Sequence, residues 1–501
     1  MSASEGPERD HWDVVVVGGG QAGETAAQYA SQFSGLSTVL VEEDLIGGEC
    51  EYWACRPSKA LLLPVEALSV GRDLPGVREM ISGRSLDVPA VLARRDDVAF
   101  HYADPQEVAF LKTNNIDLVR GRGRLAGSKK VAVTASDGSV RTITAEHAVV
   151  LATGSSALVP PTDGLAAALP WTSRDVTAVR EVPRRVVVIG GGPVACEAIT
   201  WLHALGVEEA TLVHRGSQLL KTMEPFASDF AARHLAEAGV AVRLNTNVTR
   251  VSRPDAQDRG VGHPHGGPVT VTLDNGGQIE ADEFVVAVGR RGGTDDIGLE
   301  TVDIPAPHGY VAVDDQCTVV GTDWLYATGD LTGRALLTHM AKYQARIAGE
   351  AITARALGKS LTEKPFNGLT TAEYDAVPHV VFLDPPLCAV GLTESAARER
   401  GIDVETAEYD IAGISGAAIS REHYDGRAKL VVDPATDTVI GATFAGTATT
   451  ELLHSATVAI VGQVPVTRLW HAVASFPTVS EIWLRLLETL QQQRRGRMRP
   501  G

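Results

Sequence analysis

Cysteine is scarce in this chain, and long apolar runs and an excess of positive charge are missing. Five cysteines occur in 501 residues, which argues against a fold held together by structural disulfide bridges. No apolar run approaches the roughly 18 residues that a transmembrane helix needs. The formal net charge of −17 argues against nucleic acid as a partner. Residues 1–10 are polar and contain no signal-peptide core, so we expect a cytoplasmic protein without a membrane partner.

The length and composition are typical of a multidomain α/β enzyme. A chain of 501 residues is expected to form roughly three domains, each large enough to bury its own core. Hydrophobic residues make up 44% of the chain, and the 50 glycines suit an α/β enzyme with several tight phosphate-binding turns.

A dinucleotide-binding glycine loop lies close to the N-terminus. An apolar strand at 14–17 runs into a Gly-x-Gly-x-x-Gly turn, which is followed by a helix-forming segment. The three glycines of the turn are Gly18, Gly20 and Gly23. A second strand at 38–41 ends in Glu42, at the distance expected for a carboxylate that binds ribose hydroxyls. Because the helix N-terminus offers amides and a positive dipole, we expect it to hold a pyrophosphate.

The same pattern recurs near the middle of the chain. A strand at 186–189 leads into a turn in which alanine replaces the third glycine, and its key positions are Gly190, Gly192 and Ala195. The next strand ends not in an acid but in His214 and Arg215, with Lys221 a little later. A 2′-phosphate needs cations, whereas a bare ribose diol prefers a carboxylate, so NADPH is favoured over NADH. The alternative is that Arg215 and Lys221 are solvated surface charges.

Cys50 and Cys55 are the candidate redox centre. Two thiols at this spacing can meet only if the backbone curls between them, as at the start of a helix or in a tight loop. A helix N-terminus there would acidify a thiol and make it a better nucleophile. The pair follows the first glycine loop closely, so we expect it to face a flavin. A structural disulfide, or two unrelated small residues, are the alternatives.

Two dinucleotide motifs and a Cys-x4-Cys pair resemble the class I pyridine nucleotide-disulfide oxidoreductases, which include dihydrolipoamide dehydrogenase, glutathione reductase and mercuric reductase. The resemblance covers nearly the whole chain. Segments 151–154, 286–291 and 326–330 are similar to further family motifs and occur in the family's order. The resemblance implies an α/β fold with two Rossmann-like, three-layer dinucleotide-binding domains and a C-terminal α+β dimerisation domain. It also implies FAD and NADPH (or NADH) as cofactors, and a homodimer.

The resemblance assigns roles to individual residues. Cys55 would be the flavin-proximal thiolate and Cys50 the interchange thiol, while Lys59 and Glu197 would pair near flavin N5 beside the nicotinamide. Besides the first glycine loop and Glu42, the expected FAD contacts are Lys59, Gly123, Thr153, Gly154, Asp330 and Thr338. Besides the second glycine loop, the expected nicotinamide-nucleotide contacts are Glu197, Arg215, Lys221 and Gly289.

The motifs divide the chain into domains. We expect the FAD domain at 11–155 and 285–355, the inserted NAD(P) domain at 160–284 and the dimerisation domain at 360–490. Segment 253–268 is rich in Gly, Pro, Asp and His, so we expect an unstructured loop on a hairpin. His263 and His265 in it are expected to be solvated rather than metal-bound, and no metal site is predicted. The polar, basic tail at 491–501 is expected to fray.

One departure from the family lies near the C-terminus. Disulfide reductases of this class read His-Pro-Thr followed closely by Ser-Glu, and the His of the partner subunit acts as acid–base for the cysteine pair. This chain has Phe476 in that place, although Glu481, which would orient the missing His, is present. Without a base, exchange with lipoamide or glutathione should lose roughly two to four orders of magnitude. His471 is the first candidate for a substitute.

These observations leave several functions open. The first is an NAD(P)H oxidoreductase that passes electrons through FAD and the cysteine pair to a small-molecule acceptor, a quinone or a disulfide. The second is an enzyme like dihydrolipoamide dehydrogenase with a substitute base. A mercuric reductase-like activity would need a further C-terminal cysteine pair, and no cysteine follows Cys388. A non-catalytic redox sensor or assembly subunit would leave an intact nicotinamide site without a purpose.

Overall fold

The computed structural model describes residues 9–32, 34–364, 366 and 368–497. These form two compact units, and each unit is built from separate stretches of the chain. The first unit takes residues up to 57, 96–158 and 290–373. The second takes 58–95, 159–289 and 374 onward.

The first unit is built around a seven-stranded sheet with the order β3-β2-β1-β6-β5-β4, in which β16 pairs with β6. Strands β1, β2, β3, β6 and β16 run parallel, while β4 and β5 are antiparallel additions. The strands are β1 (His11–Val17), β2 (Thr38–Glu42), β3 (Ile116–Arg120), β4 (Arg122–Leu125), β5 (Lys130–Thr134), β6 (Val140–Leu151) and β16 (Leu325–Ala327). A two-stranded ribbon joins β7 (Ser155–Ala157) to β15 (Arg290–Gly292).

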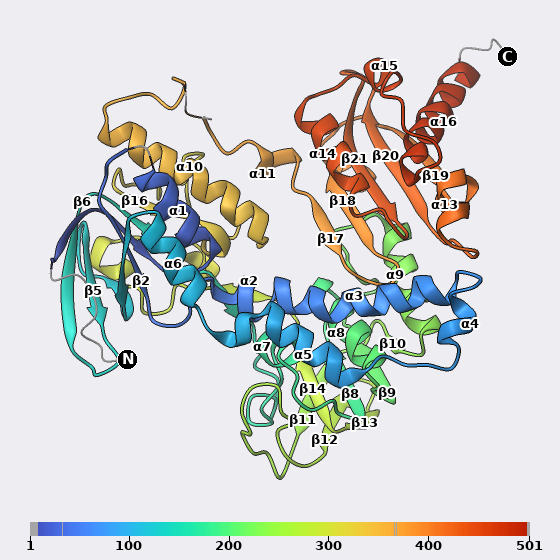
Figure 1. Ribbon diagram of the computed structural model, residues 1–501, viewed down its shortest axis with the longest axis horizontal. Coiled ribbons are helices and arrows are strands. Elements are labelled where there is room, and N and C mark those ends of the chain that lie inside the picture. Colours follow the sequence, from blue (N-terminus) through green and yellow to red (C-terminus); the bar gives the residue numbers. More distant parts are fainter. Residues whose placement is uncertain (1–8, 33, 365, 367, 498–501) are drawn as a thin grey trace. The chain divides into compact units, whose positions relative to one another are not determined.

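Alternation along β1 explains why this sheet is covered on both faces. Val14 and Val16 pack into one apolar cluster, with helices α1 (Gln21–Ser31) and α10 (Thr338–Ala356). Val15 and Val17 point to the opposite face and a second cluster. The two helices lie side by side (Figure 1), because Gly349 lets α10 approach the α1 backbone at Tyr29. The remaining helices of this unit are α2 (Gly48–Tyr52) and α6 (Pro105–Thr113).

The second unit contains a four-stranded parallel sheet with the order β10-β9-β8-β14. Its strands are β8 (Arg185–Ile189), β9 (Glu209–Val213), β10 (Ala241–Arg243) and β14 (Glu283–Val286). Helices cover one face, and a three-stranded antiparallel sheet packs through a separate apolar cluster. These helices are α7 (Ser173–Thr177), α8 (Pro193–Ala204) and α9 (Pro225–Glu237), and the antiparallel strands are β11 (Val248–Ser252), β12 (Val269–Leu273) and β13 (Gln278–Ala281). Helix α3 (Cys55–Arg72), which begins in the first unit, packs against α8 through Leu61 and Leu62.

The C-terminal part of the second unit is a five-stranded antiparallel sheet with the order β17-β18-β21-β20-β19. The strands are β17 (His379–Val381), β18 (Leu387–Gly391), β19 (Glu405–Asp410), β20 (Arg427–Asp433) and β21 (Thr438–Ala445). Helices α14 (Leu452–Val461) and α16 (Ile482–Arg497) pack on it. The shorter helices of this part are α12 (Glu394–Glu399), α13 (Ser415–Ser420) and α15 (Val466–Leu469), and α11 (Ala372–Asp375) precedes β17. Helices α4 (Arg78–Ile81) and α5 (Val88–Val98) follow α3 earlier in the chain.

The predicted fold class is confirmed, since two layered parallel sheets are followed by a mixed C-terminal domain. The predicted domain limits stay predictions, because the second unit holds both the second parallel sheet and the C-terminal sheet. None of the described helices is both long enough and apolar enough to cross a bilayer.

Segment 253–268 is the loop between the antiparallel strands β11 and β12, as expected of a hairpin, but the expectation that it is unstructured is wrong. The Arg253 side chain is fully buried and forms an ion pair of 2.5 Å with Glu283. The backbone N–H of His265 donates to the other Glu283 oxygen at 2.8 Å, and His265 is buried rather than solvated. The buried Glu283 carboxylate needs these partners, and they order the loop. His263 contributes its carbonyl oxygen to the Trp171 indole at 3.0 Å.

The expectation that the tail frays from residue 491 is also wrong as far as Arg497. Helix α16 extends to that residue. Arg494 contacts Glu405 at 2.7 Å and Asp437 at 2.8 Å, and Arg497 contacts Glu405 at 2.8 Å. The basic residues therefore tie the end of the helix to strand β19 and the turn before β21. Residues 498–501 lie outside the described part of the chain.

Candidate redox and dinucleotide site

Cys50 and Cys55 meet at a break between two helices. Cys50 lies in α2 and Cys55 is the first residue of α3. Both are half-buried thiols that are not joined in a disulfide, and the two are hydrogen-bonded to each other. Thr338, the first residue of α10, lies 3.2 Å from the Cys55 sulfur through its hydroxyl and also hydrogen-bonds Cys50. The structure therefore gathers two thiols and one hydroxyl from three helices.

The pKa of Cys50 is raised rather than lowered in this dithiol state. The hydrogen bond to Cys55 is the largest cause, followed by burial and by the negative charge of Cys55 and of Glu51. The acidification expected from the sequence is therefore wrong for Cys50 in the reduced pair. A raised pKa means that Cys50 keeps its proton.

Lys59 lies one helical turn after Cys55 on the same face of α3. Its Nζ contacts Glu197 Oε2 at 2.8 Å, and the Glu197 side chain is only 8% exposed. The other oxygen of Glu197 accepts a hydrogen bond from the Phe382 backbone at 3.0 Å. Lys59 also lies over the Phe382 ring, 4.5 Å from its centroid. Glu197 belongs to α8, the helix that follows the second glycine loop.

The first glycine loop has the close approaches that its sequence predicts. A Cβ on Gly18, whose φ is +101°, would overlap the carbonyl oxygen of Ala152. A Cβ on Gly23 would overlap the Gly18 carbonyl, so α1 can pack this tightly on β1 only with glycine there. Glu42 accepts hydrogen bonds from the Gly19 N–H at 2.6 Å and the Asp44 N–H at 2.7 Å. Burial raises the pKa of Glu42 above its ordinary value.

Asp330 is held by a small polar network. Ser155 donates to its carboxylate at 2.5 Å, and Arg290 contacts Ser155 Oγ at 2.6 Å and Glu49 at 2.6 Å. Burial raises the pKa of Asp330. No sequence motif marks the side chains of Arg290, Ser155 or Glu49 as parts of this network. The only sequence signal for Arg290 was its place next to Gly289 in the segment 286–291.

Among the other residues expected to contact FAD, Gly154 faces open space, whereas Thr153 and Gly123 have contacts within the protein. Gly154 faces open space, since an added Cβ would meet no atom within 4 Å. Thr153 donates its hydroxyl to the Gly293 carbonyl at 2.7 Å. Gly123 lies in β4, where a Cβ would press on Val17, so packing by itself accounts for glycine there.

The second glycine loop is built in the same way. A Cβ on Gly190 would overlap the Ala287 carbonyl and would touch the Ala195 Cβ at 3.3 Å. Gly192 is the N-cap of α8 and faces open space. Gly191 lies against the His214 imidazole. The absence of side chains along this turn leaves room for the phosphates of a dinucleotide.

Arg215 and Lys221 are exposed side chains close to His214. Burial, Arg215 and Lys221 together lower the pKa of His214, so this imidazole is neutral at physiological pH. Gly289 directly precedes β15, with φ +143°. The two cations therefore share one end of the sheet with the second glycine loop, beyond strand β9.

Phe476 and Glu481 lie in the C-terminal part of the second unit. The Phe476 residue is 74% exposed and Val473 is 90% exposed. Glu481 accepts hydrogen bonds from the backbone N–H groups of Gly416 at 2.9 Å and Thr478 at 3.1 Å. Glu481 thus already holds its own turn in place, and His471 is exposed.

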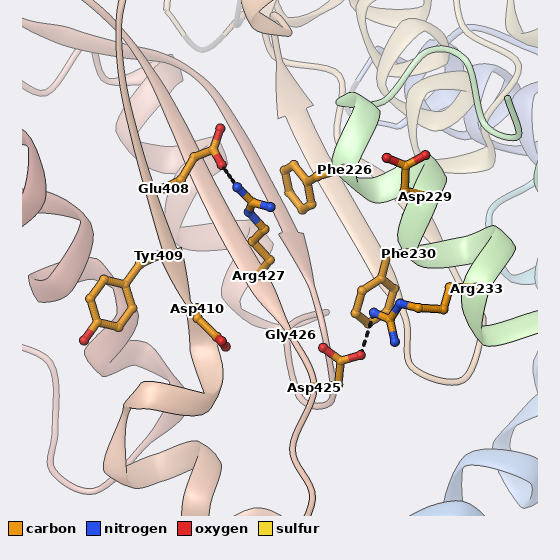
Figure 2. A pocket seen from close by; sticks show the side chains of 10 residues that line it. All are labelled: Phe226, Asp229, Phe230, Arg233, Glu408, Tyr409, Asp410, Asp425, Gly426 and Arg427. Atoms are coloured by element: carbon orange, nitrogen blue, oxygen red, sulfur yellow. Dashed lines mark hydrogen bonds and ion pairs between the residues drawn. The ribbon is translucent and has the colours of Figure 1, made fainter. Parts of the chain in front are cut away.

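A cleft of about 460 Å³ lies between α9 and the edge of the C-terminal sheet (Figure 2). Arg233 pairs with Asp425 at 2.7 Å and lies over a phenylalanine ring. Arg427 pairs with Glu408 and lies over the ring of Phe226. Because Arg233 and Arg427 already form salt bridges with carboxylates, neither guanidinium is available to bind a ligand in this cleft.

Comparison with known proteins places the chain in a family. Residues 12–345 match the pyridine nucleotide-disulphide oxidoreductase model, and residues 377–486 match the dimerisation domain of the same family. The dihydrolipoyl dehydrogenase of Chlorobaculum tepidum is 31% identical over 474 residues, which is 94% of this chain and 95% of that one. The glutathione reductase of Burkholderia cepacia is 29% identical over 476 residues, or 95% and 98%.

A solved structure agrees with these sequence relatives. The crystal structure of LpdA from Mycobacterium tuberculosis has a TM-score of 0.80 and 25% identity, and the match covers 97% of this chain and 100% of that one. Such proteins use FAD and NAD(P)H, and the open glycine turns beside Glu42 and α8 fit both nucleotides. The chain is therefore an enzyme of the pyridine nucleotide-disulphide oxidoreductase family, with FAD and NAD(P)H as its cofactors and NAD(P)H and a sulfur group as the targets of its chemistry.

Proposed function

We propose that this enzyme passes electrons from NADPH through FAD and the Cys50–Cys55 pair to a small-molecule acceptor, a quinone or a disulfide. One observation carries the proposal. Helix α3 presents Cys55 and, one turn later, Lys59, whose ammonium contacts Glu197 from the helix of the second glycine loop. A single helix thus connects the cysteine pair to the residues beside the nicotinamide.

The chain's residues divide the work. Bound FAD supplies two-electron transfer from NAD(P)H to the disulfide. The two electrons break the sulfur–sulfur bond. Cys50 takes up one proton and becomes a thiol, and Cys55 remains a thiolate. The raised pKa of Cys50 favours this distribution of the proton. Thr338 can donate its hydroxyl hydrogen to the Cys55 sulfur, and Glu197 holds the Lys59 ammonium in place.

The preference for NADPH is part of the proposal. Arg215 and Lys221 follow strand β9, where the ribose-binding acid of an NADH enzyme is expected. Both are exposed and available to a 2′-phosphate. His214 between them and the glycine loop is neutral, so the two longer side chains supply the positive charge.

Phe476 favours an acceptor that needs no proton shuttle. A phenyl ring cannot act as acid–base, so thiol exchange with lipoamide or glutathione disulfide should be slow. A quinone can be reduced without this exchange. We also propose a homodimer, supported by the match to the dimerisation domain and by the exposed apolar side chains of Val473 and Phe476. The cytoplasmic location expected from the sequence stays a prediction.

A dihydrolipoamide dehydrogenase-like activity is the second candidate. It is favoured by the relatives of that name, which match along 94% of this chain. It requires another base in place of residue 476, and His471 is the first to test. A mercuric reductase-like activity ranks below both, because no cysteine follows Cys388.

A steady-state screen of the FAD-loaded enzyme tests the proposal. NADPH and NADH are each combined with lipoamide, glutathione disulfide, a benzoquinone, a naphthoquinone and mercuric ion. We expect NADPH with a quinone to give the highest kcat/KM. Fast turnover of lipoamide by the unmutated enzyme would overturn the proposal in favour of the second candidate.

A further inference from the structure

A second cavity lies away from both glycine loops. It has a volume of about 410 Å³ and is bounded by the C-terminal halves of α3, α8 and α9 and by the segment after β17. This volume lies within the range of roughly 300–1,000 Å³ that small-molecule sites occupy. Leu68, Leu86, Leu235 and Leu383 supply much of its apolar wall.

Two buried polar atoms on residues of this wall have no hydrogen-bond partner within the described chain. These atoms are Asp384 Oδ1 and His203 Nδ1. The Asp384 carboxyl group is hydrogen-bonded to Ser69, which leaves Oδ1 unsatisfied. An unsatisfied buried polar atom costs about 1–3 kcal/mol. A carboxylate oxygen accepts, and His203 Nδ1 accepts when Nε2 carries the proton, so one donor beside the cavity can satisfy both atoms.

The charges around the cavity favour a cation as that donor. Burial raises the pKa of Asp384, although Ser69, Arg421 and His234 oppose the shift. Burial and the negative charge of Asp384 raise the pKa of Glu66, and Arg421 opposes that shift. Arg72, also in the wall, donates to the Arg84 carbonyl at 2.8 Å. His234, the remaining titratable group in the wall, lies 2.9 Å from Asp425. Arg421, which acts on Asp384 and Glu66 from outside the wall, pairs with Asp73 at 3.1 Å, so the cations near the cavity have other partners. An ammonium group carries three donors and no acceptor, which matches two unpaired acceptors.

We propose that this cavity binds a small, mainly apolar molecule that bears an ammonium group. The ammonium donates to Asp384 Oδ1 and to His203 Nδ1, in the tautomer that carries its proton on Nε2. The apolar body lies against the leucines of α3, α9 and the segment after β17. Neither glycine loop contributes to this cavity, so the ligand is separate from FAD and NAD(P)H.

Helices α3 and α8 connect the cavity to the Lys59–Glu197 pair. Val65 of the wall is six residues beyond Lys59 on α3, or about 9 Å along the axis. Thr200 is three residues beyond Glu197 on α8, or about 4.5 Å. A ligand bound between these helices therefore shifts the position of Lys59 relative to Glu197. This coupling rests on the proposed role of Lys59 and Glu197, whereas binding itself does not.

The binding test uses 1-naphthylmethylamine as the probe and isothermal titration calorimetry on the FAD-loaded enzyme. We expect a dissociation constant below about 1 mM, with the neutral isostere 1-naphthylmethanol at least about fivefold weaker. Asp384→Asn should weaken the amine about tenfold and change the alcohol less than about twofold. Absence of amine binding at 5 mM, as expected if water fills the cavity, would overturn the proposal.

A cavity-filling variant tests the location. Ala204→Phe places a ring in the cavity from α8 and should abolish amine binding. Ala67→Phe makes the same change at an exposed site on α3 outside the wall and should bind the amine normally. Equal binding by wild type and Ala204→Phe would refute this site, and Asp384→Asn gives an independent reading if Ala204→Phe folds poorly.

The coupling is measured separately, by stopped-flow reduction of the flavin with NADPH. Saturating amine should change the rate at least about twofold in wild type and leave it unchanged in Ala204→Phe. An unchanged wild-type rate alongside clear binding would remove the coupling and leave the binding site. Failure of NADPH to reduce the flavin at all would instead contradict the proposed function.

Discussion

At the scale of single residues, the two cysteines of the redox pair have different surroundings. Cys50 keeps its proton because of its raised pKa, whereas Cys55 begins α3 and contacts Thr338. We predict that two-electron reduction gives the long-wavelength absorption of a Cys55 thiolate beside oxidised FAD. Cys55→Ser should abolish this absorption, and Cys50→Ser should show it without reductant. Identical visible spectra of the two variants would contradict the assignment.

Arg215 and Lys221 carry the second prediction at this scale. Charge-assisted contacts to a phosphate contribute roughly 1.5–3 kcal/mol each. The double variant Arg215→Ala/Lys221→Ala should therefore weaken NADPH by a few kcal/mol and leave NADH nearly unchanged. The measurement is the KM for each nucleotide, with exposed Arg259→Ala of the same unit as the matched control. A wild-type enzyme that prefers NADH would refute the assignment.

Glu24 gives a prediction about pH. Burial, followed by the negative charges of Glu107 and Glu51, raises its pKa to about 9, while Lys342 opposes the shift. The folded protein then holds a proton on Glu24 that the unfolded chain releases above about pH 4.5. Stability contributed by this proton is present below pH 4.5 and is lost as the pH rises toward 9.

The variant Glu24→Gln tests this sign. It removes the titration, so its melting temperature should exceed that of wild type at pH 9 by several degrees and differ little at pH 5. Exposed Glu43→Gln serves as the control, since it should shift neither value. A wild-type protein that gains stability between pH 5 and pH 9 relative to Glu24→Gln would show the opposite sign.

At the scale of elements, sequence patterns located the glycine loops because their chemistry is local. Gly18, Gly23 and Gly190 lie where a side chain would overlap a neighbouring carbonyl, and such a turn has a short, recognisable pattern. The network of Ser155, Arg290 and Asp330 has no such pattern. It joins segments that are far apart in the chain, so only the fold brings them together.

The loop at 253–268 shows the same limit more sharply. Its composition is typical of an unstructured segment, yet Arg253 and His265 are buried because Glu283 of β14 requires partners. The composition of a loop indicates how much entropy is lost when the loop is ordered. It does not show that a buried carboxylate elsewhere in the chain will contact the loop in the fold. The tail is ordered, contrary to expectation, for the same reason. Glu405 and Asp437 are far from Arg494 in the sequence but contact it in the fold.

Removing Arg253 should therefore destabilise the second unit. Arg253→Met leaves Glu283 buried without its cation, and losing one partner of a buried ion pair costs about 3–5 kcal/mol. Urea unfolding followed by tryptophan fluorescence measures the loss. Arg259→Ala changes an exposed arginine of the same loop and should be neutral. If Arg253→Met unfolds at the wild-type urea concentration, the loop is not held by this pair.

At the scale of the whole molecule, Phe476 connects the state of assembly to the chemistry. In the proposed homodimer, the family resemblance implies that residue 476 of one subunit faces the cysteine pair of the other. Phe476→His should raise lipoamide turnover, because Glu481 is present to orient an imidazole. We expect a gain of about ten- to a hundredfold in kcat/KM, part of the roughly 10²–10⁴ that general acid–base catalysis contributes. His471→Ala is the control, and it should leave turnover unchanged.

The two results have different meanings. High lipoamide turnover that is lost in His471→Ala would show that His471 is the base. An unchanged rate in Phe476→His, in a protein that sedimentation shows to be a dimer, would contradict the assignment of residue 476 to the acid–base position. A monomer that reduces acceptors at the full rate would contradict the homodimer itself.

The division of the first unit between distant stretches also determines when it can fold during synthesis. Strand β6 needs β16 as its neighbour at 149–151, and α1 needs α10 as its packing partner. A ribosome that has just released β6 must still translate the chain up to residue 327, which takes roughly 9 to 35 seconds at 5–20 residues per second. Throughout that interval the nascent sheet has an unpaired, strongly apolar edge at Val149–Leu151. The second glycine loop and its parallel sheet emerge meanwhile and can fold first, so we expect the sheet that is synthesised first to be completed last.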